Sequence, residues 1–410
     1  MSAKKLSSSS FEHYSNNSQR QVRVKQQLIT MLYKGGQLSI HDFSKSLKLS
    51  APTIAKAVDE LIDQQLVIKS GTGNSSGGRR PGLYSINPSA RYVLAIDLER
   101  SFIRLGLFDC ANNLVAPIDE FNEGLDTLPD VFTYITGKVN ELLAKKKINK
   151  NKVLGIGVSL PGLIDIHTGL SYTYLADNRP VAENLSELTG IRTFVEHDTK
   201  LMAWGELAFG LAKGLNNVLC LNVGSGIGLS MILNGTIYKG HSGYSGEFGH
   251  IQIENDGDLC HCGKYGCIET IAAGKSLIHK ANQQIAAGRD TILASNTEKT
   301  HLKLTTTAII DGALAGDSLC NELISEAGEA LGRGMAVLLH LFNPELIIIG
   351  GELSKAASLL IDPIVKNINK HTIERIRKDT RIEISNIGEN ARIMGSLALV
   401  MNKIFSSQMT

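Results

Sequence analysis

Long apolar runs are missing from this chain of 410 residues. No stretch approaches the roughly 20 apolar residues that a membrane-spanning helix needs. The opening Met-Ser-Ala-Lys-Lys-Leu-Ser-Ser-Ser-Ser lacks the apolar core of a secretory signal. These absences predict a cytoplasmic protein without membrane contact, whose thiols stay reduced. The apolar share of 43% still suffices for the cores of two or three domains.

Net charge is also small, at +2, but it is unevenly distributed. Residues 1–86 carry twelve Lys or Arg and five Asp or Glu, a formal charge of +7, which leaves −5 for residues 87–410. A small basic segment on a larger acidic body predicts that the first part binds a polyanion. A solvated charged face is the alternative that charge alone leaves open.

Three helices are predicted near the N-terminus. Apolar residues recur at helical spacing in three segments between Gln21 and Ile62. Ser39 and Asp42 have the spacing of a capping box for the second helix. Ser50 is placed to cap the third, which would carry the polar face that reads DNA.

A β-hairpin is predicted to follow these helices. Strand-like runs at 66–69 and 83–86 flank a glycine-rich segment with two adjacent arginines. Helices and hairpin together predict a winged helix-turn-helix over residues 20–87, after a flexible segment 1–19. A protein-docking module is the alternative. The expected contacts with double-stranded DNA come from Ser50, Pro52, Thr53, Lys56, Arg79 and Arg80.

Strands alternate with helices in the remainder of the chain, which predicts an α/β body. The first such segments are strands at 92–97, 102–108 and 114–121, a helix at 128–146 and a strand at 153–159. The order of strand, loop and hairpin returns from Val218 to Tyr238, so the body is predicted to be duplicated. Two facing α/β lobes form a cleft, the usual place for a small ligand.

One imidazole and three thiols cluster in the second half of the chain, at His250, Cys260, Cys262 and Cys267. A Cys3His set suits tetrahedral Zn²⁺ and leaves no open position, which predicts a structural ion. Disulfides or inert thiols are the alternatives, and the short spacing and odd number oppose them. His261 lies between two of the ligands and is the alternative to His250 as the fourth one, but its side chain is expected to point away from the thiolates, which favours His250. The other cysteines lie in apolar runs and are expected to be buried thiols: Cys110, Cys220 and Cys320.

From about Arg20 to its end the chain resembles the repressors of the ROK family, which also contains sugar kinases. The resemblance implies an actin-like, two-lobed body, with a first lobe of residues 88–198 plus 391–410 and a second lobe of 199–390 holding the zinc site. It also implies a sugar pocket between the lobes and homodimers or homotetramers that read pseudo-palindromic operators. The motifs that carry it are Gly77-Gly-Arg-Arg-Pro81, Gly155 to Asp165, Gly224-Ser225-Gly226-Ile-Gly228, Glu247 to Glu269 and Gly350-Gly351-Glu-Leu-Ser354.

In the family's kinases two glycine loops hold the phosphates of ATP through backbone amides. The loop at Gly224 is kept here, as is Gly350-Gly351. In the other loop Asp97 is followed by Leu98-Glu99-Arg100 instead of glycines. A leucine and a carboxylate at these positions hinder close backbone approach and repel phosphate. We therefore expect that ATP turnover is lost and that these loops are vestigial.

The resemblance places Asp198 where the kinases have the base that accepts a proton from the sugar hydroxyl. His197 stands where they have Asn, as in amino-sugar-type repressors, which favours an amino sugar or a phosphorylated sugar. Glu247 and Glu269 would accept hydrogen bonds from hydroxyls, while Gly162 would allow close backbone approach. The expected sugar-binding set is therefore Gly162, His197, Asp198, Glu247, His250 and Glu269.

The sequence thus predicts a sugar-responsive, DNA-binding transcriptional regulator, in the simplest case a repressor, of genes for carbohydrate uptake or catabolism. One alternative is an ATP-dependent kinase of a hexose or N-acetylhexosamine that carries a DNA-binding head. The other is a regulator whose effector is a protein that docks on the body.

Overall fold

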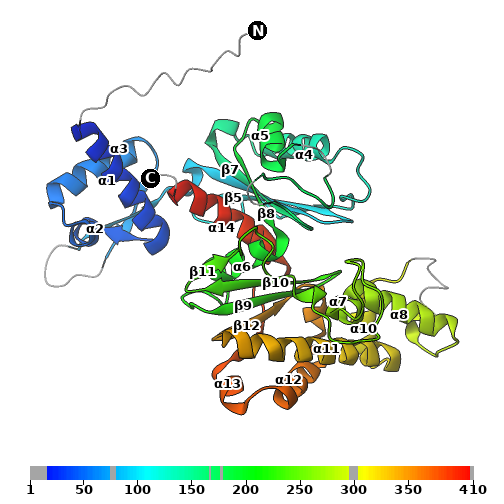
Figure 1. Ribbon diagram of the computed structural model, residues 1–410. Coiled ribbons are helices and arrows are strands. Elements are labelled where there is room, and N and C mark those ends of the chain that lie inside the picture. Colours follow the sequence, from blue (N-terminus) through cyan, green and yellow to red (C-terminus); the bar gives the residue numbers. More distant parts are fainter. Residues whose placement is uncertain (1–15, 74–79, 166–167, 176–178, 295–302, 407–410) are drawn as a thin grey trace, which may run out of the picture.

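The computed structural model describes residues 16–73, 80–165, 168–175, 179–294 and 303–406 (Figure 1). Arg79 lies outside the described residues. The described chain forms a small N-terminal module, here called the head, and two α/β lobes, each built on one five-stranded sheet. None of the helices in these segments combines the length and the apolar character needed to cross a membrane.

The head contains the three helices and the hairpin that the sequence predicts. The capping box is confirmed, because Asp42 N–H donates to Ser39 and the Asp42 carboxylate accepts from Ser39 N–H. Ser50 caps the third helix by accepting from Thr53 N–H. The elements are α1 (Asn16–Gly35), β1 (Leu38–Ser39), α2 (Ile40–Leu47), α3 (Ala51–Asp63), β2 (Val67–Thr72) and β3 (Gly82–Ile86), with strand order β1-β3-β2.

The first lobe is a sheet of order β6-β5-β4-β7-β8 with two helices on its outer face. Alternate residues of β4 point to opposite faces, so Leu94 and Ile96 join the core under these helices while Val93 and Ala95 face inward. The elements are β4 (Tyr92–Leu98), β5 (Ile103–Asp109), β6 (Asp119–Phe121), α4 (Val131–Lys145), β7 (Val153–Leu160), α5 (Val181–Thr189) and β8 (Thr193–His197).

The second lobe repeats this plan with the order β11-β10-β9-β12-β13 and a larger helical layer. Its elements are α6 (Asp198–Phe209), β9 (Val218–Val223), β10 (Ile227–Leu233), β11 (Thr236–Tyr238), α7 (Ile268–Ala272), α8 (Gly274–Ala286), α10 (Thr306–Leu314), α11 (Ser318–Phe342), β12 (Leu346–Gly350), α12 (Ser358–His371), α13 (Glu374–Asp379) and β13 (Arg381–Ile384). In both sheets the first three strands are antiparallel and the last two run parallel to the central one. The duplicated, actin-like two-sheet body is therefore confirmed.

One predicted strand is shorter than expected. The run 114–121 was expected to form a single strand, but β6 begins only at Asp119, and Leu114 makes an isolated bridge with Phe108. Pro117 lies between these two pairings. Because proline has no N–H to donate to a ladder, a continuous strand across it is disfavoured.

Two helices lie between the sheets: α6, and α14 (Ala391–Ser406), drawn red in Figure 1. Helix α14 covers the inner face of the first sheet, and α6 covers that of the second. The two helices meet where glycine leaves room. A Cβ at Gly395 would lie 1.8 Å from the carbonyl oxygen of Leu201, and one at Gly205 would lie 2.2 Å from that of Ala391. The junction of the lobes therefore depends on these small residues.

Replacing Gly395 with Ala should separate α6 from α14 and lower the free energy of unfolding by about 3 kcal/mol or more, as overpacking against backbone does. Gly137→Ala is the matched control, because a Cβ at this position of α4 has nothing within 4 Å. We expect that control to be neutral or to stabilise by about 0.5–1 kcal/mol. Urea unfolding of both variants measures the difference. Equal stabilities would contradict the close contact.

Candidate functional site

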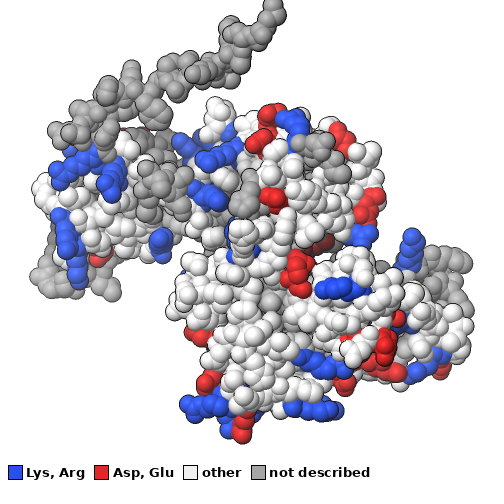
Figure 2. All heavy atoms as spheres, viewed as in Figure 1, with Lys and Arg blue, Asp and Glu red and all other residues white. Residues whose placement is uncertain are grey.

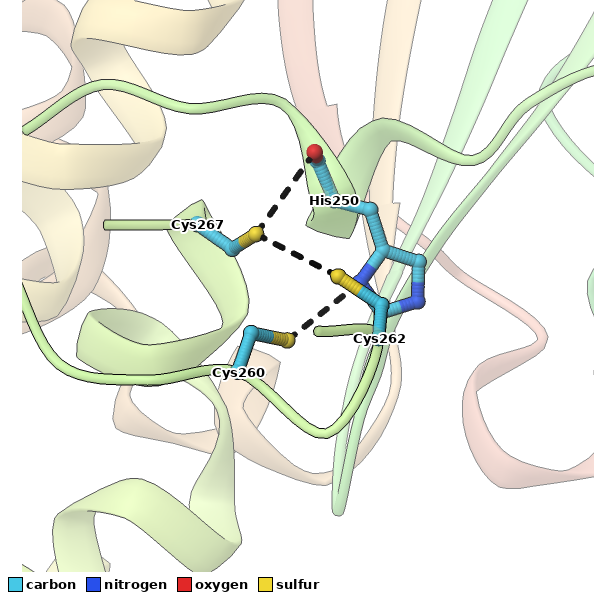
Figure 3. Close-up of side chains that lie close together, drawn as sticks. All are labelled: His250, Cys260, Cys262 and Cys267. Carbon is cyan, nitrogen blue, oxygen red and sulfur yellow. Dashed lines mark hydrogen bonds between the residues drawn. The ribbon is translucent and has the colours of Figure 1, made fainter. Parts of the chain in front are cut away.

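The predicted metal ligands lie together at the start of the second lobe's helical layer (Figure 3). His250 ends a short 3₁₀ turn, Phe248–His250, and Cys267 caps α7. The Nδ1 atom of His250 lies 3.6 Å from Cys260 Sγ, and the Cys262 and Cys267 sulfurs are 3.7 Å apart. One ligand atom from each of the four residues lies within 4.8 Å of all the others.

These distances fit a tetrahedral ion. With metal–sulfur bonds of about 2.3 Å, neighbouring sulfurs of a tetrahedron are separated by about 3.8 Å. The Cys262–Cys267 separation of 3.7 Å is close to that value. A disulfide has a much shorter sulfur–sulfur distance of about 2 Å. The four residues can therefore hold a metal ion.

His261 differs from the expectation that its side chain points away. Its Nδ1 lies 3.7 Å from Cys260 Sγ and 3.2 Å from Glu269 Oε1. The rings of His250 and His261 stand nearly edge to face, 5.0 Å apart between centroids. His261 thus links the cysteine cluster to Glu269, a contact that spacing along the sequence did not indicate.

Glu269 is buried in α7 and has a partner on each carboxylate oxygen. Ile227 N–H donates to Oε2 at 3.1 Å, and Lys275 Nζ donates to Oε1 at 2.6 Å. Burial alone would raise the pKa of Glu269, but the hydrogen bond and charge of Lys275 outweigh it and hold the pKa below its usual value. Glu269 is therefore an ionised acceptor, and Lys275 is a neighbour that the sequence reasoning missed.

Glu247 lies on the other side of His250. Its Oε2 is 3.8 Å from His250 Nε2, the ring nitrogen remote from the cysteines. The Glu247 side chain is 45% exposed, so it has room to accept a further hydrogen bond. One edge of the His250 ring thus faces the sulfurs and the other faces Glu247.

His197 and Asp198 occupy the junction of β8 and α6. His197 caps the helix by accepting from Thr199 N–H through Nδ1, and Asp198 Oδ1 accepts from the same N–H at 2.6 Å. Both side chains are largely buried. A Cβ at Gly228 would lie 2.3 Å from Thr199 Oγ1, so the glycine loop of the second lobe lies against the residue that follows Asp198.

The glycine motifs of the second lobe converge on one place. A Cβ at Gly226 would lie 3.1 Å from Glu269 Oε2, and one at Gly224 would lie 3.9 Å from the backbone nitrogen that follows Gly351. Ser225 lies between them in the loop that joins β9 to β10. Gly351 has a φ of +84°, and a Cβ there would meet Val223 O at 2.5 Å. The loop, Gly350-Gly351 and Glu269 therefore share one end of the sheet.

Gly162 lies close to Thr173 within the chain. Its φ is +80°, and a Cβ there would lie 2.6 Å from the Cβ of Thr173. Thr173 Oγ1 also accepts from Leu163 N–H at 2.9 Å. The packing of Thr173 against the backbone is thus sufficient to explain the glycine without a ligand.

The end of β4 and the turn that follows it contact Arg392 of α14 in an ion cluster, and Arg392 is a residue that the sequence reasoning missed. Arg392 Nε lies 3.1 Å from Asp97 Oδ2, and its guanidinium also forms an ion pair with Glu99. Asp198 Oδ2 is 3.9 Å away. Arg392 is the second residue of α14 and lies 295 residues from Asp97 in the sequence, so no local pattern indicates the pairing.

Burial and the neighbouring charges shift the pKa values of Glu99 and Arg392 in this cluster. Burial raises the pKa of Glu99 to about 7; Arg392 opposes the shift, whereas Asp97 and Asp198 add to it. The pKa of Arg392 is raised by the same carboxylates despite its burial. Arg100, next in the sequence, instead pairs with exposed Asp126 at 2.8 Å.

The candidate DNA contacts lie on the outside of the head. Ser50, Pro52, Thr53 and Lys56 are exposed along the first turns of α3, and Arg80 is exposed beside β3. A groove of about 280 Å³ between α1 and α3 is lined by Arg20, Gln21, Val24, Lys25, Leu49, Thr53, Lys56, Ala57 and Glu60. In Figure 2 basic side chains predominate over acidic ones on this part of the visible surface.

Comparison with known proteins gives consistent matches. A model described as the ROK family matches residues 93–403. The xylose repressor of Caldicellulosiruptor bescii is 28% identical over 370 residues, which cover 88% of this chain and 91% of that protein. A solved ROK family transcriptional regulator, a homologue of Escherichia coli Mlc, has a TM-score of 0.77 at 26% identity and covers 95% of this chain and 98% of its own. A glucokinase from Streptomyces griseus, solved with glucose and AMPPNP, has a TM-score of 0.63 at 25% identity. The match covers 75% of this chain and 98% of the glucokinase chain.

The raised pKa of Glu99 predicts a pH dependence of stability. A carboxyl whose pKa is higher in the folded state contributes fully below its unfolded pKa, and that contribution is lost as the pH rises through about 7. Between about pH 5 and about pH 8 the wild type should therefore lose on the order of 2 kcal/mol relative to Glu99→Gln. Unfolding of both proteins across this range measures it, with Asp126→Asn as an exposed control. Parallel pH profiles for wild type and Glu99→Gln would rule out the raised pKa.

Proposed function

Because the chain belongs to the ROK family, we propose that it is a sugar-responsive, DNA-binding transcriptional regulator, most simply a repressor, of genes for carbohydrate uptake or catabolism. The observation that carries this proposal is the extent of the match. Regulators align with 88–95% of the chain, head included, whereas the glucokinase covers 75%. A head attached to a sugar-kinase-type body suits a protein in which sugar binding changes DNA binding.

The head, taken as residues 20–87, is the proposed DNA reader in the form of a winged helix-turn-helix. Its support is the exposed polar start of α3, with Thr53 and Lys56 beside a basic groove. Arg80 is exposed where the wing returns to β3. Homodimers or homotetramers would present two such heads to the halves of an operator. The lobes keep the proposed bounds of 88–198 plus 391–410 and 199–390.

The sugar or sugar phosphate would lie between the lobes, close to Asp198 and Glu269. Support comes from the second lobe's glycine loop, which lies against both Thr199 and Glu269. Acceptor groups at Asp198, Glu247 and Glu269 suit the hydroxyls of a sugar, and the outer edge of His250 adds a ring nitrogen. His197 and Gly162 complete the proposed set, with Gly162 the least supported because Thr173 already explains it.

Zn²⁺, held by His250, Cys260, Cys262 and Cys267, would supply rigidity rather than chemistry. It would fix the ring of His250 with one edge toward the sulfurs and the other toward Glu247. The same loop leads through Cys267 into α7, which carries Glu269. Two of the proposed sugar contacts would therefore be oriented by one ion.

A sugar kinase with a DNA-binding head is the second candidate, favoured by Asp198 at the position of the base and by the glucokinase match. Against turnover is the cluster at the first phosphate loop, where Glu99 and Arg392 form an ion pair beside Asp97. A polyphosphate there would meet carboxylates rather than free backbone N–H groups. We therefore propose that the protein is not an enzyme. Steady ATP- and sugar-dependent release of ADP, above ~1 per second per chain, would favour the kinase instead.

The regulator predicts sugar-dependent DNA binding. Genomic fragments selected by the full-length protein should bind it, and one of D-xylose, D-glucose, N-acetyl-D-glucosamine or their 6- or 5-phosphates should weaken binding by the 5- to 150-fold that is typical of coupling between sites. Lys56→Ala should weaken DNA binding and lower the slope of log affinity against log salt by about 1, with unchanged sugar affinity. Lys138→Ala, on α4 of the first lobe, is the control. Failure to select any fragment would remove the proposed function.

The zinc proposal predicts one ion per chain. Cys262→Ser should lose it, as measured by mass spectrometry of the native protein, whereas Cys110→Ala should keep it because Cys110 is a core thiol that donates to Arg91 O. Sugar affinity should fall by at least tenfold in Cys262→Ser while DNA affinity changes less. Full zinc content in that variant would show that the ligand set is wrong.

A further inference from the structure

Helix α14 has its two ends in different functional regions. Arg392, its second residue, lies in the ion cluster at the junction of the lobes, and Phe405, one residue before its end, lies against the head. Figure 1 shows the red helix running from the centre of the body toward the head. One rigid element therefore connects the proposed sugar site with the proposed DNA reader.

The start of α14 is held by groups from both lobes. Arg104 of β5 donates to Glu389 O at 2.8 Å and to Asn390 Oδ1 at 2.7 Å. Lys355, just after Gly350-Gly351 of the second lobe, forms an ion pair with the Glu389 side chain. Glu389 and Asn390 precede α14 and contact both lobes. A change in the relative position of the lobes therefore acts on this end of the helix.

The middle of α14 is too closely packed to absorb such a change by bending. Gly395 lies against Leu201 O, and a Cβ at Gly157 of β7 would be 2.3 Å from Ser396 O. Backbone contacts this close transmit displacement, because packed interiors have little free space to deform into. We expect α14 to shift as one body.

The far end of α14 touches the head through aromatic rings. Phe405 and Tyr33 of α1 have ring centroids 4.8 Å apart, and the Tyr33 hydroxyl lies 3.0 Å from Asn112 Oδ1, in the turn after β5. Burial raises the pKa of Tyr33 to about 12, so its hydroxyl stays protonated and donates to Asn112. Tyr33 is therefore anchored at once to α14 and to the first lobe.

We infer that α14 couples sugar binding to the orientation of the head, with Arg392 as the positioning residue at one end and the Phe405–Tyr33 contact at the other. The inference rests on the proposed function. A sugar hydroxyl that binds Asp198 competes for a carboxylate near Arg392, and closure of the lobes moves the anchors on Glu389. The sugar changes DNA affinity only as far as it prefers one position of α14 over the other.

The decisive variant is Phe405→Ala, which removes the ring contact and leaves the ion cluster and the proposed sugar contacts intact. Sugar affinity is measured by calorimetry without DNA, and operator affinity with and without the sugar that releases the wild type. We expect the sugar affinity to stay within about twofold of wild type. The operator affinity without sugar, divided by that with sugar, should fall below about 2. A ratio equal to that of the wild type, or a parallel loss of sugar affinity, would overturn the inference. Tyr134→Leu, which removes another aromatic pair of the first lobe, is the control.

A second measurement needs no sugar. Hydrogen exchange of residues 28–35, the C-terminal part of α1, should be at least about threefold faster in Arg392→Met than in wild type. Arg100→Met is the matched control, because Arg100 follows Glu99 in the same loop but pairs only with exposed Asp126 at this site. Unchanged exchange in folded Arg392→Met would overturn the coupling through α14. If the wild type bound no DNA, or if none of the sugars changed its DNA binding, the proposed function would be contradicted. That result is distinct from a failure of the coupling through α14.

Discussion

The close crossing of α6 and α14 is the contact on which the rest of the body depends. Each helix covers the inner face of a different sheet, so the position of one lobe relative to the other is set where Gly395 meets Leu201 and Gly205 meets Ala391. Asp198 begins the first of these helices and Arg392 nearly begins the second. The geometry of the proposed sugar site and the packing of the lobes are therefore one constraint.

Much of the fold follows from local signals in the sequence. The capping box at Ser39 and Asp42, the strand at 92–97 and the repeated strand order were all predicted from neighbouring residues, and the structure contains them. The thiols of the metal cluster span eight residues, and His250 lies ten residues before the first of them, so their spacing was informative. The metal itself and the roles of the site residues stay predictions.

The parts that sequence reasoning missed share one physical property, which is that their partners are set by tertiary packing. Arg392 pairs with Asp97 across 295 residues of sequence, and no periodicity indicates such a pair. Lys275 and His261 are near Glu269 in sequence, but the direction of their side chains depends on how the loop folds around the cysteines. The contact between Gly162 and Thr173 is likewise set by the folded loop and could not be predicted from the sequence.

Two buried carboxylates with opposite pKa shifts support the proposed separation of sugar binding from phosphoryl transfer. Lys275 and Ile227 N–H hold Glu269 ionised, ready to accept from a hydroxyl, whereas Glu99 is raised to about 7 by burial beside Asp97 and Asp198. The first environment favours a polyhydroxylated ligand, and the second disfavours the concentrated negative charge of a nucleotide. In the proposed function, the first environment would hold the sugar, and the internal ion pair of Glu99 and Arg392 would take the place of a bound phosphate. Arg392 would then have a structural role near the start of α14, the helix that reaches the head.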